Sequence, residues 1–136
     1  MTVPAFPSTS FALVVDDDAF IRMDAAAILE DVGFETFEAA HADAAVRVLH
    51  ERHRHLTLLF TDVQMPGTLD GFALARYVSE HWPHISIVVA SGQARPSPGE
   101  LPEGAHFIAK PFSVQIVHDH LKSMIPDERK PKPLRD

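Results

Sequence analysis

The apolar residues of the chain predict short buried strands that alternate with amphipathic helices. The clearest strand is an apolar run that begins at Leu58, stops at Asp62 and breaks in the turn Pro66-Gly67. Similar short apolar runs predict strands at residues 11–15, 85–90 and 105–109, with a weaker strand at 35–38. Strands that are continuously apolar are typical of a parallel sheet that is covered on both faces.

Apolar residues at helical spacing predict helices over residues 19–32, 42–52, 70–82 and 113–125. Asp70 and Ser113 stand where a helix needs an N-terminal cap, and Gly33 stands where the first helix should end. Segment 93–104 contains three prolines, which remove backbone donors, so no regular helix is expected there.

This alternation predicts a single α/β domain, with a doubly wound, five-stranded parallel sheet between two layers of helices. A chain of 136 residues is long enough for one domain with its own core. We expect a flexible leader over residues 1–10, a folded domain over 11–125, and a disordered, charged and proline-rich tail over 126–136.

Composition narrows the function classes. The net charge of −7 disfavours direct binding to nucleic acid, which requires a basic surface. The absence of cysteine excludes thiol catalysis and disulfides. No apolar run approaches the roughly 18 residues of a membrane span, and the start of the chain does not resemble a signal peptide, so we expect a cytoplasmic protein.

Polar residues follow four of the expected strands. Asp16 and Asp17 come after the first strand, and three further polar residues, Asp62, Ser91 and Lys110, end the third, fourth and fifth. The carboxyl ends of parallel strands share one edge of the sheet, so these groups should converge there.

Convergent carboxylates repel one another, and a divalent cation relieves that repulsion. Oxygen ligands without cysteine favour Mg²⁺. A cation, the Lys110 ammonium and the Ser91 hydroxyl together suit a phosphoryl group, and Asp62 is the central candidate for the nucleophile that accepts it.

Four motifs then resemble one family. These are Val14–Asp17, Asp62–Pro66 together with Asp70-Gly71, Ser91-Gly92, and Lys110–Phe112. Together they resemble the receiver domain of bacterial two-component response regulators, over about residues 11–125. The resemblance implies a flavodoxin-like sheet in the order 2-1-3-4-5, here with a degenerate fourth helix in the proline-rich segment 93–104.

The resemblance also implies how the phosphoryl group and the metal are held. Asp62 would accept the phosphoryl group from a sensor histidine kinase or a phosphotransfer protein. Mg²⁺ would bind Asp17, Asp62 and the main-chain carbonyl of Gln64, with Asp16 acting through a water molecule.

Further implied roles concern the switch. Ser91 and Lys110 would contact phosphoryl oxygens, and the Lys110–Pro111 peptide bond would be cis. Phe107 takes the position of the switch aromatic but carries no hydroxyl. Gln64 and Gln93 take positions that tune the lifetime of the phosphoryl group.

The first interpretation is a stand-alone, phosphorylation-dependent switch rather than a turnover enzyme, acting on an unknown downstream protein, with its oligomeric state left open. A second is a degenerate receiver that binds its partner without phosphorylation. A third, a Mg²⁺-dependent phosphatase with an aspartyl nucleophile, is disfavoured because Gln64 stands where such an enzyme needs a second Asp as general acid. Asp18 is interpreted as a helix-start residue, and Arg22 and Arg76 as surface charges.

Overall fold

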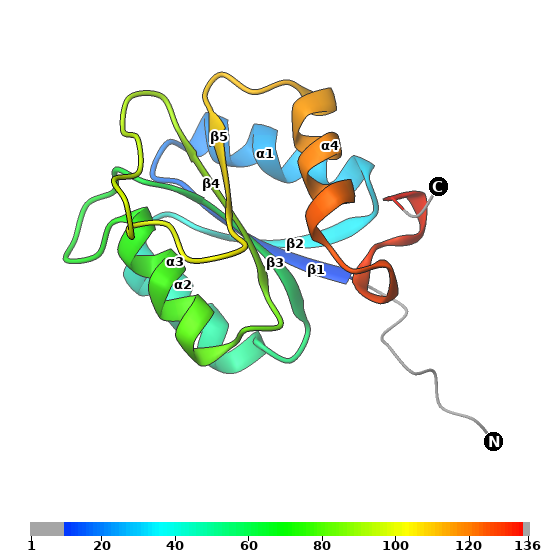
Figure 1. Ribbon diagram of the computed structural model, residues 1–136, viewed down its shortest axis with the longest axis horizontal. Helices are drawn as coiled ribbons and strands as arrows, with labels where there is room; N and C mark the ends of the chain where they lie inside the picture. Colours follow the sequence, from blue (N-terminus) through cyan, green and yellow to red (C-terminus); the bar gives the residue numbers. More distant parts are fainter. Residues whose placement is uncertain (1–9, 135–136) are drawn as a thin grey trace.

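The computed structural model describes residues 10–134, which form a five-stranded sheet with two helices on each face (Figure 1). In chain order the elements are β1 (Ser10–Val15), α1 (Ala19–Asp31), β2 (Phe34–Ala39), α2 (Ala42–Arg52), β3 (Leu56–Asp62), α3 (Gly71–His81), β4 (Ser86–Ser91), β5 (His106–Ala109), α4 (Val114–Met124) and two short 3₁₀ turns, Asp127–Arg129 and Lys132–Leu134.

All neighbouring strands are parallel, in the order β2-β1-β3-β4-β5. This confirms the predicted fold class and strand order. In the register of the sheet Val15 pairs with Thr61, and Asp62 pairs with Ala90. The ends of β1, β3 and β4 are therefore level with one another, and the polar residues that follow them meet at one edge.

Alternate residues of β1 enter two separate cores. Ala12 and Val14 of β1 pack in the layer of α1 and α4, whereas Leu13 and Val15 pack in the layer of α2 and α3 (Figure 1). Leu13 and Val14 are almost completely buried, as is expected for a strand covered on both faces. This burial explains why β1 and β3 read as continuous apolar runs in the sequence.

The helices begin where the sequence predicts. The side chains of Asp18, Asp70 and Ser113 each accept a hydrogen bond from a backbone N–H in the first turn of α1, α3 and α4. The role of Asp18 as a helix-start residue is thus confirmed. Among residues 10–134, none of the helices is long and apolar enough to cross a membrane.

No helix forms between β4 and β5, as the prolines predict. Arg76 of α3 donates a hydrogen bond from Nη1 to the carbonyl of Glu100 at 2.9 Å, which links this segment to α3. The guanidinium of Arg95 lies over the ring of Phe107, 5.5 Å from its centroid. The interpretation of Arg76 as a simple surface charge was wrong, because its partner lies 24 residues away in a segment of no regular structure.

The expectation of a disordered tail was wrong for residues 126–134. Leu134 is fully buried in the core beside α1 and α4. A Cβ atom on Gly33, whose φ is +107°, would lie 2.7 Å from Cβ of Pro131, so the tail packs directly on the glycine that ends α1. Charge and proline content suggest disorder locally, but they do not reveal an apolar side chain that packs about a hundred residues away.

The tail also contacts the start of β1. The Ser10 hydroxyl donates to the carbonyl of Arg129 at 3.2 Å. Ser10 is therefore the first residue of the sheet and not part of a leader, and the rest of the expected leader, residues 1–9, lies outside the described residues.

Replacing Leu134 with alanine should lower the free energy of unfolding by about 2–3 kcal/mol, because a fully buried leucine leaves a cavity that a chain end can partly close. Urea denaturation measures this loss. Lys132→Ala changes an exposed residue of the same turn and should leave the free energy of unfolding nearly unchanged. Equal losses in the two variants would contradict the packing role of Leu134.

Candidate functional site

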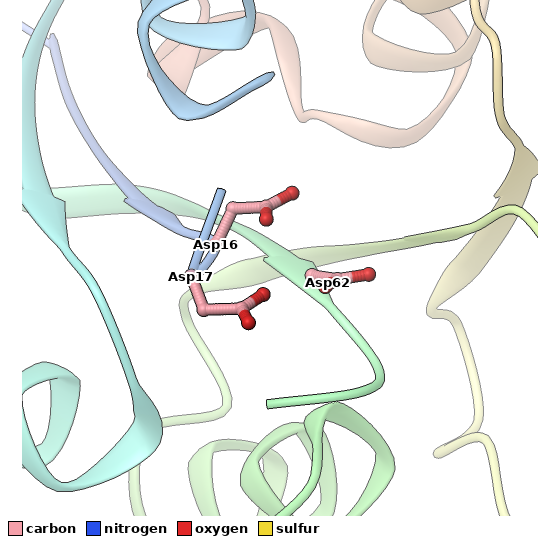
Figure 2. A group of neighbouring side chains, drawn as sticks. All are labelled: Asp16, Asp17 and Asp62. Carbon is pink, nitrogen blue, oxygen red and sulfur yellow. The ribbon is translucent and has the colours of Figure 1, made fainter. Parts of the chain in front are cut away.

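Three carboxylates meet at the carboxyl edge of the sheet. Asp16 and Asp17 follow β1, and Asp62 is the last residue of β3. Their side chains point in the same direction (Figure 2), and one oxygen of each lies within 4.8 Å of the others. Asp16 and Asp62 are buried, whereas Asp17 is exposed. The sequence predicted this convergence, and the structure confirms it.

The donor set fits a hard divalent cation. It consists of carboxylate oxygens only, two of them shielded from water and one open to solvent. Mg²⁺ is commonly held by one or two carboxylates and keeps several of its waters, which the exposed side of Asp17 would accommodate. Among residues 10–134 this is the only cluster of three or more carboxylates or imidazoles that could hold a metal ion.

Lys110 supplies the positive charge of the site. Its Nζ lies 2.8 Å from Oδ2 of Asp16 and 3.0 Å from Oδ1 of Asp62, so one ammonium bridges both buried carboxylates. Burial by itself lowers the pKa of Lys110, but the hydrogen bonds to Asp16 and Asp62 outweigh it and raise that pKa. The lysine is therefore held in its charged form. The Lys110–Pro111 peptide bond is cis, as expected.

Asp62 is the member of the cluster whose ionised form is disfavoured. Burial raises its pKa above the ordinary value, and the negative charge of Asp16 raises it further, while the hydrogen bond from Lys110 opposes both effects. A carboxylate that is costly to keep ionised gains from any cation placed beside it. The electrostatics of Asp62 thus agree with the donor set in favouring a bound metal ion.

Gly71 packs against the backbone of Asp62. A Cβ atom at residue 71 would lie 1.9 Å from the carbonyl oxygen of Asp62, and the N–H of Gly71 donates to the carbonyl of Val63 at 2.8 Å. Any side chain at this position would push the start of α3 away from the end of β3. The Asp70-Gly71 pair predicted the start of a helix, but this close approach appears only in the structure.

Ser91 lies on β4, which pairs with β3, and Phe107 lies on β5, which pairs with β4. Ser91 is the buried last residue of β4, and its Oγ accepts a hydrogen bond from the N–H of Ala94 at 3.1 Å. Phe107 of β5 is half-buried and lies against Phe72, with ring centroids 6.5 Å apart. The predicted switch residues therefore flank the acidic cluster on one side.

Gln64 and Gln93 are both exposed, in the segments that follow β3 and β4. Their suggested effect on phosphoryl lifetime stays a prediction. The sequence also missed Arg22, which is not a free surface charge: it donates from Nη1 to the carbonyl of Asp16 at 2.8 Å. A single arginine four residues after the acidic run carries no local sign of this contact.

Comparison with known proteins identifies the family. The sequence model of the response regulator receiver domain matches residues 12–122. The chain belongs to this family.

Relatives of known name include a sensor kinase and a phosphotransferase. The chain is 31% identical over 121 residues to the sensor kinase CckA of Brucella abortus, covering 87% of this chain and 13% of that protein. It is 27% identical to the sporulation initiation phosphotransferase F of Bacillus subtilis, covering 84% of this chain and 92% of that protein. The chain thus spans only a small part of some of the relatives it matches.

Solved structures show the same fold. The receiver domain of the hybrid histidine kinase CckA matches with a TM-score of 0.73 and 27% identity, over 85% of this chain and 99% of that domain.

The pKa of Asp62 predicts how stability depends on pH in the absence of metal. A carboxyl group with a higher pKa in the folded state binds protons more tightly when folded. As the pH rises above the ordinary aspartate value of 3.8, the unfolded chain therefore loses this proton first, and the free energy of unfolding falls. Asp62→Asn removes this effect and keeps the shape of the side chain.

In EDTA, the stability of Asp62→Asn relative to wild type should consequently increase as the pH rises above 3.8, and this increase should end above the raised pKa of Asp62. Urea denaturation at a series of pH values measures this margin between the two proteins. Glu103→Gln, an exposed loop residue, removes one charge elsewhere and serves as the control. A margin that does not change with pH would show that burial does not penalise the Asp62 carboxylate.

Proposed function

We propose that this receiver domain accepts a phosphoryl group on Asp62 in a His-Asp phosphorelay, in a Mg²⁺-dependent reaction that switches a contact with another protein. The observation that carries the proposal is the arrangement of Asp16, Asp62 and Lys110, in which one ammonium contacts two buried carboxylates at a sheet edge. Membership of the receiver family supports it, because receiver domains are normally phosphorylation switches and not turnover enzymes.

The transfer step would exchange one bond for another. One carboxylate oxygen of Asp62 would form a bond to phosphorus, while the bond between phosphorus and the imidazole nitrogen of a phosphohistidine donor breaks and its electron pair returns to the imidazole. Bound Mg²⁺ would neutralise the charge of the transferring group. Asp17, Asp62 and the carbonyl of Gln64 would hold the metal, and Asp16 would act through a water molecule.

Two side chains of this protein would then hold the phosphoryl oxygens. Lys110 already lies 3.0 Å from Asp62 in its charged form and would pair with one oxygen. The Ser91 hydroxyl oxygen accepts from Ala94, so its own O–H remains available to donate to another. Movement of Ser91 towards the phosphoryl group would also pull on Ala94. It would therefore move the start of the segment between β4 and β5.

An apolar surface beside the site suits the phosphoryl donor. Phe20 is 85% exposed and Met23 is 59% exposed, one turn apart on α1, and Val114 and Ile116 at the start of α4 are also exposed. A pocket of about 340 Å³ lies between α1 and the residues around Lys110. Large exposed apolar side chains beside a reactive group indicate a surface that a protein partner covers. We propose that the histidine kinase or phosphotransfer protein docks here.

The alternatives fit less well. A degenerate receiver would have no need for the Lys110 bridge or for three converging carboxylates, although it would share the fold. A phosphatase would need a general acid two residues after Asp62, and Gln64 cannot act as one. A cytoplasmic location remains a prediction from the sequence, and so does a downstream protein partner.

Incubation with acetyl phosphate and Mg²⁺ should add one phosphoryl group to the wild-type protein and none to Asp62→Asn, as measured by intact mass. Chelation of the metal should abolish the adduct. If the wild type gains no phosphoryl group and also forms no beryllofluoride complex, the degenerate binding module becomes the better interpretation.

A histidine kinase that phosphorylates the wild type is first found by testing phosphorylated kinases one at a time. Phe20→Ser should slow transfer from that kinase, because the substitution removes apolar contact with the donor protein. The rate of labelling by acetyl phosphate should not change, since Phe20 is 85% exposed and contributes little to the fold. Equal slowing with both donors would place the effect in the acidic site and not at a docking surface.

A further inference from the structure

Arg22 connects the acidic site to β2, the outermost strand of the sheet on this side. Its Nη1 donates to the carbonyl oxygen of Asp16 at 2.8 Å, and its Nε donates to Oε1 of Glu38 on β2 at 3.1 Å. The Arg22 side chain is only 19% exposed, against 40% for Glu38. A guanidinium is planar and offers several fixed donors, so one side chain can hold both partners at once.

The contact with Asp16 is made by the backbone and not by the carboxylate. The carbonyl that Arg22 holds belongs to the planar peptide group that joins Asp16 to Asp17. The N–H of Asp16 is already fixed by the carbonyl of Ala39, at 3.1 Å. With both sides of Asp16 held, the orientation of the peptide group that leads into Asp17 is fixed as well.

Asp17 depends on this backbone for its direction. Its carboxylate is exposed and makes no hydrogen bond or ion pair with any other residue of the range 10–134. Asp16, in contrast, has its carboxylate held by the N–H of Asp18 at 2.9 Å and by Lys110 at 2.8 Å. The peptide group before Asp17 therefore sets where this exposed carboxylate is attached.

We propose that Arg22, itself oriented by Glu38, is a positioning residue for the metal site, because it fixes the direction in which Asp17 presents its carboxylate. This inference rests on the proposed function, in which Asp17 is a ligand of Mg²⁺. Arg22 does not touch the metal. It acts through the Asp16–Asp17 peptide group.

Charge and geometry predict opposite effects for the loss of Arg22. If its positive charge mattered most, its removal would tighten Mg²⁺ binding, since like charges repel. If its hold on the peptide group matters most, its removal weakens binding, as the loss of an outer-shell partner of a ligand does. The sign of the change in affinity therefore distinguishes the two.

The experiment measures the Mg²⁺ dissociation constant of the unphosphorylated protein by isothermal titration calorimetry, with no phosphodonor present. Arg22→Met should weaken binding about tenfold, at the lower end of the range for outer-shell partners. Arg54→Met removes the same charge from the exposed turn before β3, at the amino ends of the strands and away from the acidic site. This variant should keep an affinity near that of wild type.

Substitutions of Glu38 provide a second test, which leaves the Arg22 side chain itself in place. Glu38→Ala removes the acceptor that orients the guanidinium and should weaken Mg²⁺ binding. Glu38→Gln keeps an oxygen acceptor at the same place without its charge, and should retain most of the affinity. Urea denaturation in EDTA, run on every variant, separates a loss of metal affinity from a loss of folding.

Labelling by acetyl phosphate gives an independent measure. In Arg22→Met the Mg²⁺ concentration for half-maximal labelling should rise in parallel with the dissociation constant, while the rate at saturating Mg²⁺ returns to that of wild type. A merely structural role would instead lower the labelling rate even at saturating Mg²⁺. Unchanged or tighter Mg²⁺ binding in Arg22→Met and Glu38→Ala overturns the positioning role and leaves the proposed function intact. A wild-type protein that binds no Mg²⁺ overturns the proposed function and this inference with it.

Discussion

The ammonium of Lys110 between the carboxylates of Asp16 and Asp62 is the interaction on which the site depends, because two buried negative charges at one sheet edge are otherwise costly. The sheet imposes this constraint. Level register at the ends of β1 and β3 places both carboxylates at the same edge, and β5 delivers the lysine from the far side of β4. The bridge compensates part of the repulsion, and the remainder favours a divalent cation.

The two sides of the site are held by different sets of contacts. On the β2 and α1 side, Asp16 is held through its amide by Ala39, through its carbonyl by Arg22 and through one carboxylate oxygen by the N–H of Asp18. On the β4 and β5 side, the segment without a helix is tied down by a few contacts, among them Ser91 with Ala94 and Arg76 with Glu100. In the proposed switch, the β2 and α1 side would hold the chemistry in place while the β4 and β5 side moves in response to it.

Much of the fold could be predicted because its signals are local. The apolar runs, the caps at Asp70 and Ser113, and the prolines between β4 and β5 each act within a few residues, and the structure confirms all of them. The tail and Arg22 were misjudged for the same physical reason. Leu134 is a single apolar residue in a charged, proline-rich segment, and Arg22 is a single charged residue on a helix. Only the position of distant segments decides whether each is buried and bonded.

The sequence by itself determined the strands, the helices and the polar residues at the strand ends, because hydrophobic period and capping depend on neighbouring residues. From these it followed that Asp16, Asp17, Asp62, Ser91 and Lys110 would share one edge of a parallel sheet. Only the tertiary structure decided which of them touch and how each carboxylate is oriented. Those properties depend on register, burial and backbone hydrogen bonds between segments far apart in the chain, such as the bond from Arg22 that fixes the peptide group before Asp17.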